Sequence, residues 1–277
     1  MAEPLLRLYP GPLEACPLEG RFLAHDLRQR GGVGRPFVYS NFISSLDGRI
    51  AQPDPVSGRR TVPPAIANAR DWRLFMELVA QADVLLVSDR LLRAVAAGRH
   101  TALIDLEADG LEDLVQWRRQ HGLVSQPVLA AVSRDLDLPA PDLAQRYTRD
   151  ILVLTPDDAP AGRVAALERG GLEVVRAGPG PYLAADDLVT ALAERGLGHI
   201  YSLAGPRMLH TLVAGGQLDR LYLTVAQVLV GGTDFDTLLR GPVLDPARGL
   251  HPVEVYWDGA APEGAGQLVQ VLEPGGR

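Results

Sequence analysis

The sequence predicts an α/β domain in which helices flank a mainly parallel sheet and antiparallel strands close its C-terminal end. Between residues 151 and 214, short apolar runs alternate with segments of helical spacing. This alternation is typical of strand–helix–strand units, whose right-handed crossovers make neighbouring strands parallel. After residue 220, three apolar segments follow one another without a helix between them. That change of pattern favours antiparallel pairing at one edge of the sheet.

The composition excludes several classes of protein. Hydrophobic residues make up 47% and charged residues 22% of the 277 residues, as in an ordinary folded protein. The net charge of −7 argues against a nucleic-acid or membrane-surface binder, because both need a basic face. Cys16 is the only cysteine and the histidines lack metal spacing, so we expect no disulfide, no metal site and no metal catalysis. Without a signal-peptide pattern or a membrane-length apolar run, a cytoplasmic protein is expected.

Two parts are predicted along the chain. Residues 1–35 are rich in Pro, Gly and Arg and are expected to form an N-terminal extension packed on the main domain, with an edge strand at 5–9 and a short helix at 20–30. Residues 36–277 are expected to form one domain, because no repeat or low-complexity linker interrupts them.

The strands of the main domain are predicted where short apolar runs end at glycine or polar residues. They cover residues 37–42, 84–87, 102–104, 128–132, 151–154, 172–175, 199–203, 221–230, 253–257 and 268–272.

The helices are predicted where apolar residues recur at helical spacing, as Trp72, Phe75 and Val79 do. They cover residues 64–82, 91–97, 111–121, 161–168, 186–195 and 207–214. Residues 52–60 and 133–148 are predicted loops, the second because prolines and an aspartate follow one another closely at 139–142.

The chain around residue 205 reads as a strand, a glycine turn and a helix. Pro206 suits the first helical position because it lacks only an N–H that has no partner there, and Gly215 and Gly216 end the helix. Backbone N–H groups at a helix start, together with the positive end of its dipole, attract phosphate. The turn is therefore a predicted phosphate site; the alternative is an ordinary strand-to-helix turn.

Several separated segments together resemble the riboflavin-pathway pyrimidine reductases, which have a dihydrofolate-reductase-like fold. The segments are 36–41, 45–51, 82–87, 126–133, 138–139, 170–175 and 204–209, with 218–221 and 228–232 in the expected downstream places. The resemblance runs from Pro36 to the C-terminus. It implies an NADPH-dependent homodimer that reduces a phosphorylated ribosylamino-pyrimidine to its ribityl counterpart.

The resemblance also implies a set of site residues. Asn41, at the end of the first strand, and Asp47 are the expected catalytic residues, and Gly48 contacts the substrate. The expected cofactor contacts are Ser44, Ser45, Ser88, Ser133, Ala204, Gly205, Pro206, Arg207, Met208 and Leu209. For several of these a plainer interpretation fits equally well: a turn at Asp47-Gly48, a turn-forming serine at 133 and a capping hydrogen bond for Asn41.

Three positions depart from the family pattern. Leu203 stands where the family usually has a glutamate that meets the substrate, and Val79 stands where it has an arginine. The threonine expected after the second strand is absent, although Arg90 or Arg93 is placed to meet a 2′-phosphate. Arg59, Arg60, Arg70 and Arg73 are the candidates to hold a substrate phosphate, although such arginines are more often solvated surface.

These departures leave three functions open. The first is the family's own reduction; the second is reduction of another small molecule, such as a pterin-like compound, on the same fold. The third is a fold relative that has lost catalysis and acts as a binding protein. A deaminase domain of the kind fused to bacterial members is not expected, because one cysteine cannot complete its zinc signature.

Overall fold

Parallel strands form the greater part of the fold. The computed structural model describes residues 3–31, 34–98, 104–146 and 149–275. The strands that pair in parallel with one another are β11 (Arg220–Ala226), β3 (Phe37–Ser45), β10 (His199–Ser202), β6 (Val84–Ser88), β7 (Val128–Val132), β8 (Ile151–Thr155) and β9 (Glu173–Arg176).

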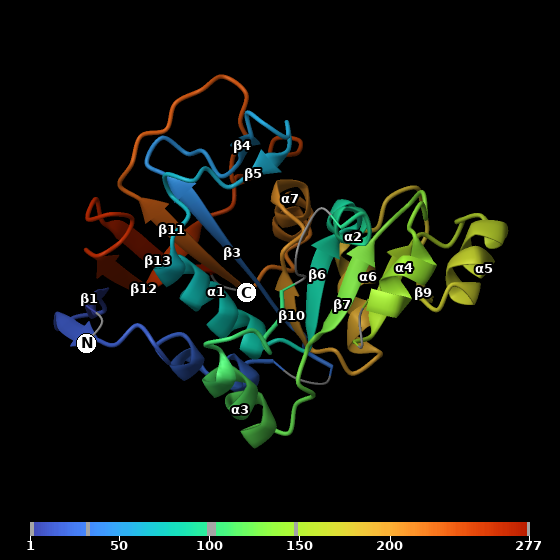
Figure 1. The fold of residues 1–277 in the computed structure, drawn as a ribbon, viewed down its shortest axis with the longest axis horizontal. Coiled ribbons are helices and arrows are strands. Elements are labelled where there is room, and N and C mark those ends of the chain that lie inside the picture. The colour runs from blue at the N-terminus through green and yellow to red at the C-terminus, as the bar shows by residue number, and fades with distance from the viewer. Residues whose placement is uncertain (1–2, 32–33, 99–103, 147–148, 276–277) are drawn as a thin grey trace.

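Antiparallel strands complete the sheet beside β11. They are β13 (Gln267–Pro274), β12 (Leu250–Asp258), β1 (Leu5–Tyr9) and β2 (Glu14–Cys16). In the described part of the chain the sheet has eleven strands in the order β2-β1-β12-β13-β11-β3-β10-β6-β7-β8-β9 (Figure 1). The predicted fold, a mainly parallel sheet with antiparallel C-terminal strands, is confirmed. β1 is not the predicted edge strand, because β2 pairs with its outer side.

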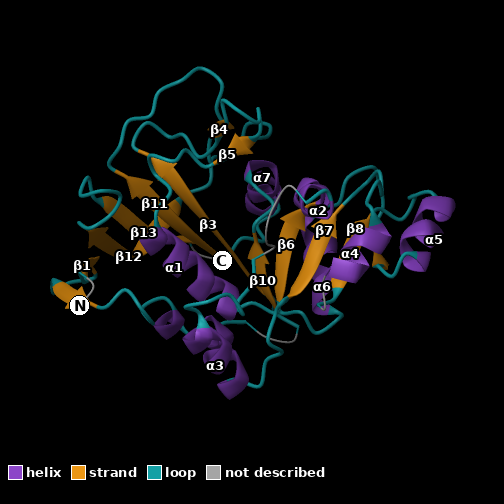
Figure 2. Cartoon of the chain, in the orientation of Figure 1, coloured by secondary structure: helices purple, strands orange, loops and turns teal. Residues whose placement is uncertain are grey.

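Helices cover both faces of the parallel strands (Figure 2). One face carries α1 (Ala69–Ala80), α2 (Asp89–Ala96), α3 (Glu112–Gln120), α4 (Ala140–Arg146) and α5 (Ala161–Arg169). The other carries α6 (Ala185–Ala193) and α7 (Pro206–Ala214). The first four residues of β6 are apolar because both faces are covered: Leu85 and Val87 pack under the first group of helices, and Val84 and Leu86 under the second.

The strand order reverses between β3 and β10. From β3 the chain moves through α1 to β6 and on to β9, away from β11. It then returns through α6 to β10, which inserts between β3 and β6, and passes through α7 to β11. Right-handed crossovers in opposite directions place their helices on opposite faces, as observed. Such a reversal opens a crevice at the carboxyl ends of the strands.

A few predicted elements are wrong. The predicted loop 133–148 contains α4, because proline is tolerated in the first turn of a helix and Asp142 suits its positive end. The predicted helix 20–30 is two short 3₁₀ turns, Leu23–His25 and Leu27–Gln29. The predicted strand 221–230 ends at Ala226. Most of the predicted strand 102–104 lies outside the described residues.

The N-terminal extension is fixed to α1. The Glu77 carboxylate accepts hydrogen bonds from the N–H groups of Gly20 at 2.5 Å and Phe22 at 2.8 Å. Gln81 accepts from the Leu27 N–H at 2.9 Å. Buried side chains of the helix thus satisfy the backbone of the extension, which would otherwise lose hydrogen bonds to water. None of the helices in the described ranges has the length and apolar character needed to cross a membrane.

Candidate active site

A step in the sheet marks the place where the strand order reverses. The last residue of β10 in register with β3 is Ser202, opposite Ser40. On its other side β3 stays paired with β11 as far as Ser45, opposite Ala226. Residues 41–45 of β3 therefore extend past the end of β10. The turn that follows β10 runs beside them and leads into α7. Ligands of α/β sheets bind in crevices of this kind.

Gly205 shapes the turn from β10 into α7. Its φ of 83° and ψ of −170° are unfavourable for a residue with a side chain, and a Cβ added there would meet no atom within 4 Å. Pro206 is the first helical residue, and the N–H groups of Arg207 and Met208, which follow it, have no carbonyl partner within the helix. The turn therefore presents backbone donors and a positive helix end to open space, as an anion site requires.

The other predicted residues of this turn differ in exposure. Ala204 and Met208 are half-buried, and Arg207 is exposed. Leu209 is 1% exposed, and its N–H donates to the carbonyl of Gly205. The side chain of Leu209 is therefore part of the core, and its N–H is engaged within the helix. Residues 204–208 thus form the turn beside the crevice, where Ala204 and Met208 also pack against the core, and Leu209 is turned into the core.

Asp47, in the loop after β3, joins that loop to the segment after β11. One carboxylate oxygen accepts hydrogen bonds from the Ser45 hydroxyl at 2.5 Å and the Val230 N–H at 3.2 Å, and the other accepts from the Gly231 N–H at 2.8 Å. The Arg49 guanidinium lies 3.4 Å away. These bonds, that from Ser45 above all, lower the pKa of Asp47 to about 2. At neutral pH Asp47 is an ionised acceptor with no proton to donate.

The segment 227–249, which joins β11 to β12, contacts both sides of the crevice and forms the long orange loop of Figure 1. The Asp236 N–H donates to the carbonyl of Ala51 at 2.8 Å, beside the loop after β3. The Arg240 N–H donates to the carbonyl of Pro206 at 3.3 Å, in the first turn of α7. One segment thereby connects the two sides of the crevice.

Asn41 is the first residue of β3 beyond the end of β10, and it is half-buried. The Tyr201 hydroxyl donates a hydrogen bond of 2.5 Å to Asn41 Oδ1. Tyr201 is fully buried and stacks on Tyr39, with ring centroids 4.7 Å apart. The prediction that Asn41 ends its strand is wrong, because β3 continues to Ser45. The shorter neighbour β10 nevertheless leaves Asn41 at the crevice.

The predicted serines make local hydrogen bonds. Ser88 caps α2 by accepting from the Leu91 N–H at 3.3 Å, and Ser133 accepts from the Leu136 N–H at 3.2 Å in the turn after β7. Ser44 donates to the neighbouring backbone carbonyl at 2.6 Å. The bond of Ser133 matches the turn-forming alternative given for that residue. The serines still lie along one edge of the sheet, at the carboxyl ends of β6, β7 and β3.

The predicted substrate residues fall into two groups. Gly48 lies in the turn after β3, and Arg59 and Arg60 lie in the hairpin of β4 (Gln52–Pro53) and β5 (Arg60–Thr61). Arg60 pairs with Asp234, in the segment that contacts both sides of the crevice.

Arg73 lies apart from this group, on α1. It is 2.8 Å from Glu77 and is also paired with Asp113 of α3, which Figure 1 shows at the opposite end of the sheet. The structure therefore does not bring Arg73 to the crevice.

Sequence reasoning missed one carboxyl group in this region. Asp71, in the first turn of α1, is 9% exposed and hydrogen-bonds with Thr224 of β11, and its Oδ1 is buried without a hydrogen-bond partner. Trp72, predicted to face the core, is 52% exposed. Asp71, Leu74 and Leu78 form the buried stripe instead. An acid at the apolar spacing of a helix is the signal that marks this site in the sequence.

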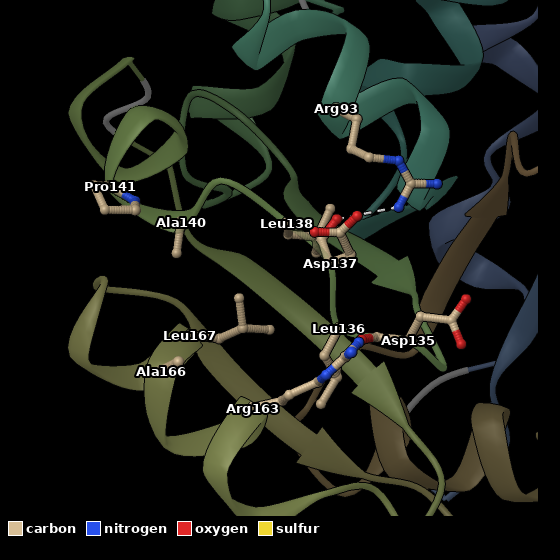
Figure 3. Close-up of a pocket in the computed structure, with 10 residues that line it drawn as sticks. All are labelled: Arg93, Asp135, Leu136, Asp137, Leu138, Ala140, Pro141, Arg163, Ala166 and Leu167. Atoms are coloured by element: carbon tan, nitrogen blue, oxygen red, sulfur yellow. Dashed lines mark hydrogen bonds between the residues drawn. The ribbon is translucent and has the colours of Figure 1, made fainter.

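A hollow of about 900 Å³ lies farther along the same edge, past the end of β7 (Figure 3). Two arginines extend into it from opposite sides. Arg93 donates to the carbonyl of Asp137 at 3.2 Å and lies 2.9 Å from Asp89, and Arg163 donates to the carbonyl of Asp135. Within the described residues, no group of three or more His, Cys, Asp or Glu side chains is arranged to hold a metal ion.

Solved structures of pyrimidine reductases share this fold. A pyrimidine reductase-like protein of Corynebacterium diphtheriae is 20% identical, with a TM-score of 0.61 over 87% of this chain and 93% of that one. The riboflavin biosynthesis reductase Rib7 of Saccharomyces cerevisiae is 14% identical, with a TM-score of 0.58 over 92% and 98%. RibD of Acinetobacter baumannii is 14% identical, with a TM-score of 0.62 over 91% of this chain and 60% of that one. This chain thus spans less than two thirds of that RibD.

The sequence gives the family directly. No protein of curated function matches the sequence of this chain. The model of the RibD C-terminal domain matches residues 36–255, which are most of the chain. The chain therefore belongs to the RibD C-terminal domain family and is a RibD-like reductase.

Proposed function

We propose that this protein uses NADPH to reduce a phosphorylated ribosylamino-pyrimidine, 5-amino-6-(5-phosphoribosylamino)uracil, to its ribityl counterpart. The observation that carries the proposal is the open glycine turn at Gly205, which faces the projecting end of β3 at the reversal of strand order. A dinucleotide and a sugar substrate both need such a crevice, because the hydride donor must lie against the reacting carbon.

The turn fits a pyrophosphate. The N–H groups of Arg207 and Met208 would donate to it, and Gly205 would let it approach the backbone closely. The nicotinamide would lie toward Ser44 and Ser45, and the adenosine toward Ser88 and Ser133, with Arg93 near a 2′-phosphate. When bound, the cofactor supplies the hydride. The protein's part is to hold the cofactor and substrate in register and to keep water out.

The substrate side is built from β3 and the loops beyond it. Asn41 presents an amide whose oxygen is already held by Tyr201, so its NH₂ group is oriented to donate to the substrate. Gly48, Arg59 and Arg60 would meet the sugar phosphate. We assign Asp47 a positioning part, because its carboxylate is ionised and holds the loop after β3 in place.

A matched pair of glycine variants tests the cofactor site. Gly205 and Gly216 lie at opposite ends of α7, have φ angles of 83° and 68°, and have open space around a Cβ. Gly205→Asp places a negative charge against the proposed pyrophosphate, and we expect NADPH binding, followed by fluorescence titration, to weaken at least about tenfold. Gly216→Asp introduces the same backbone strain at the other end of α7, away from the crevice. This variant should bind NADPH as tightly as the unaltered protein does.

The reaction is tested next. Loss of NADPH absorbance with the ribosylamino-pyrimidine phosphate is the expected result. Binding of NADPH without turnover of this compound would favour another substrate, such as a pterin-like one. No binding at millimolar NADPH would leave a non-catalytic binding protein as the remaining alternative.

We also propose a cytoplasmic homodimer. Leu46 and Leu229 are 52% and 72% exposed, and they are neighbours because the Leu46 N–H donates to the carbonyl of Val228 at 2.9 Å. Exposed apolar side chains beside a crevice are suited to a subunit contact. Light scattering coupled to size exclusion should give twice the chain mass, and Leu229→Lys should lower it.

A further inference from the structure

Two buried carboxylates near the start of α1 have opposite surroundings. Asp258 is 0% exposed, and the Arg70 Nε lies 2.9 and 2.7 Å from its oxygens, with Gln267 donating at 3.1 Å. Asp71 has the neutral Thr224 hydroxyl as a partner, and its Oδ1 is buried with none. A buried carboxyl group left half-satisfied costs free energy. Such groups are retained where they serve a function more often than elsewhere.

A helix-capping role does not account for Asp71. Asn68 caps α1 by accepting from the N–H groups of Arg70 and Asp71, which makes Asp71 the third helical residue. An acid at this position usually reaches back to the N–H of the cap residue. Asp71 hydrogen-bonds instead with Thr224, a buried residue of β11 beneath the helix. Its carboxyl group is turned toward the sheet.

Asp71 lies on the face of the sheet that carries Asn41. Tyr222 of β11 is in register with Asn41, and Thr224 lies two residues after Tyr222. The side chains of Thr224 and Asn41 therefore lie on the same face of the sheet. Phe75, one turn after Asp71, packs against Tyr201 with ring centroids 5.8 Å apart. The first turns of α1 therefore cover the carboxyl ends of β10, β3 and β11, beside the step.

We propose that Asp71, in its protonated form, is the acid that opens the sugar ring of the substrate. This rests on the proposed function. Asp47 is held as an anion by Ser45, Val230 and Gly231, and Leu203, which follows β10, is apolar. Among the described residues, Asp71 has a buried carboxyl oxygen without a hydrogen-bond partner, and the neighbouring Arg70 is bound to Asp258 instead.

The proposed step transfers one proton. The Asp71 carboxyl gives its proton to the ring oxygen of the ribosylamine while the bond from C1 to that oxygen breaks, and the bonding pair stays on the oxygen. The nitrogen lone pair forms the C1=N⁺ bond in its place. C1 would then accept the hydride that bound NADPH supplies, and the C=N pair would return to nitrogen, which would give the ribitylamine and NADP⁺. Solvent later returns the proton to Asp71.

The surroundings suit an acid that keeps its proton to a higher pH than an ordinary aspartate does. The ionisable groups that face Asp71 are Asp258 on β12 and Tyr201 on β10, and Arg70 beside it is already bound to Asp258. Desolvation above all, and then the charge of Asp258, raise the pKa of Asp71 to about 6, and the Thr224 hydrogen bond opposes this rise. A pKa near the working pH is what general acid catalysis requires.

The pH profiles of three proteins test the proposal with NADPH and the ribosylamino-pyrimidine phosphate. In the unaltered protein, kcat/KM should fall as the pH rises through about 6. Asp71→Asn should lower kcat at least about 100-fold and remove this fall, while its affinity for NADPH stays unchanged. Thr224→Val removes the bond that lowers the pKa, so its fall should move to higher pH. A purely structural Asp71 would not produce that shift.

A measurement without turnover accompanies the profiles. With ¹³C-labelled aspartate, one carboxyl signal that is missing in Asp71→Asn should titrate near pH 6. Titration in the ordinary aspartate range, about pH 4, would overturn the proposal, as would an Asp71→Asn variant with the rate and profile of the unaltered protein. An unaltered protein that binds NADPH but does not reduce this substrate would instead overturn the proposed function, and with it this role.

Discussion

The hydroxyl of Tyr201 donates a hydrogen bond of 2.5 Å to Oδ1 of Asn41, and this bond fixes the amide of Asn41 at the step in the sheet. An amide can present either its oxygen or its NH₂ group to a ligand. Because Tyr201 occupies the oxygen, the NH₂ group is left for the crevice. The same bond gives a direct test of the substrate side.

Tyr201→Phe should weaken substrate binding and leave cofactor binding unchanged. The variant releases the Asn41 amide, and the loss of one hydrogen bond of about 1 kcal/mol corresponds to about a fivefold higher KM for the pyrimidine. Tyr39→Phe is the matched control, since Tyr39 stacks on Tyr201 but donates to the Leu78 carbonyl away from the step. Equal KM values for the two variants would contradict the role given to Asn41.

Asp47→Asn should reduce stability at neutral pH and remove a pH dependence. The folded pKa of about 2 is below the ordinary value of 3.8, so the contribution of Asp47 is present above about pH 4 and is lost as the pH falls toward 2. We expect the Tm of the variant to fall by a few degrees at pH 7, measured by calorimetry, and to match that of the unaltered protein near pH 2. A constant difference across this range would show that the charge of Asp47 is unimportant.

Asp71→Asn should have the opposite effect on stability. A carboxyl whose pKa is raised from 3.8 to about 6 on folding destabilises the folded state as the pH rises through this window, and the penalty is constant above it. Two pKa units correspond to about 3 kcal/mol. Chemical denaturation at pH 7 should therefore show a gain of about 1 to 3 kcal/mol that disappears near pH 4. A variant that is more stable but slower would identify a site kept for function.

Glu77→Ala should detach the N-terminal extension. The carboxylate is 0% exposed, accepts from the backbone of Gly20 and Phe22, and pairs with Arg73 at 2.8 Å. Removing it leaves buried N–H groups without an acceptor and leaves Arg73 with Asp113 as its remaining acidic partner, which costs about 3 to 5 kcal/mol. Urea unfolding should show this loss, and limited proteolysis should cut the extension first. Glu112→Ala, at an exposed position of α3, should change neither result.

The fold could be predicted where one strand or helix carries its own signal. β8 is buried at every position, and its unbroken apolar run shows this in the sequence. The turn at Gly205 could be predicted for the same reason, because a glycine before a proline at a helix start needs no distant partner to be recognised.

The rotation of α1 could not be predicted in this way. Its first turn is fixed by Asn68 donating to Gln267, 199 residues away, and by Arg70 binding Asp258, 188 residues away. These long-range bonds turn Asp71 inward and Trp72 outward. Local apolar spacing fits both rotations, because Trp72 and Phe75 recur at the same interval as Asp71 and Leu74, and only the distant partners decide between them.

The insertion of β10 between β3 and β6 has a consequence for how the protein folds. Ser40 and Ser202, which meet through a hydrogen bond of 2.7 Å, are 162 residues apart. During synthesis, the inner edges of β3 and β6 must therefore wait unpaired until residue 202 has left the ribosome. Unpaired apolar strand edges invite pairing with other chains, and sheets with such distant partners form slowly. In this topology β3 and β6 can pair with each other before β10 has been made, which gives a misfolded sheet. The two strands must then separate again before β10 can enter between them.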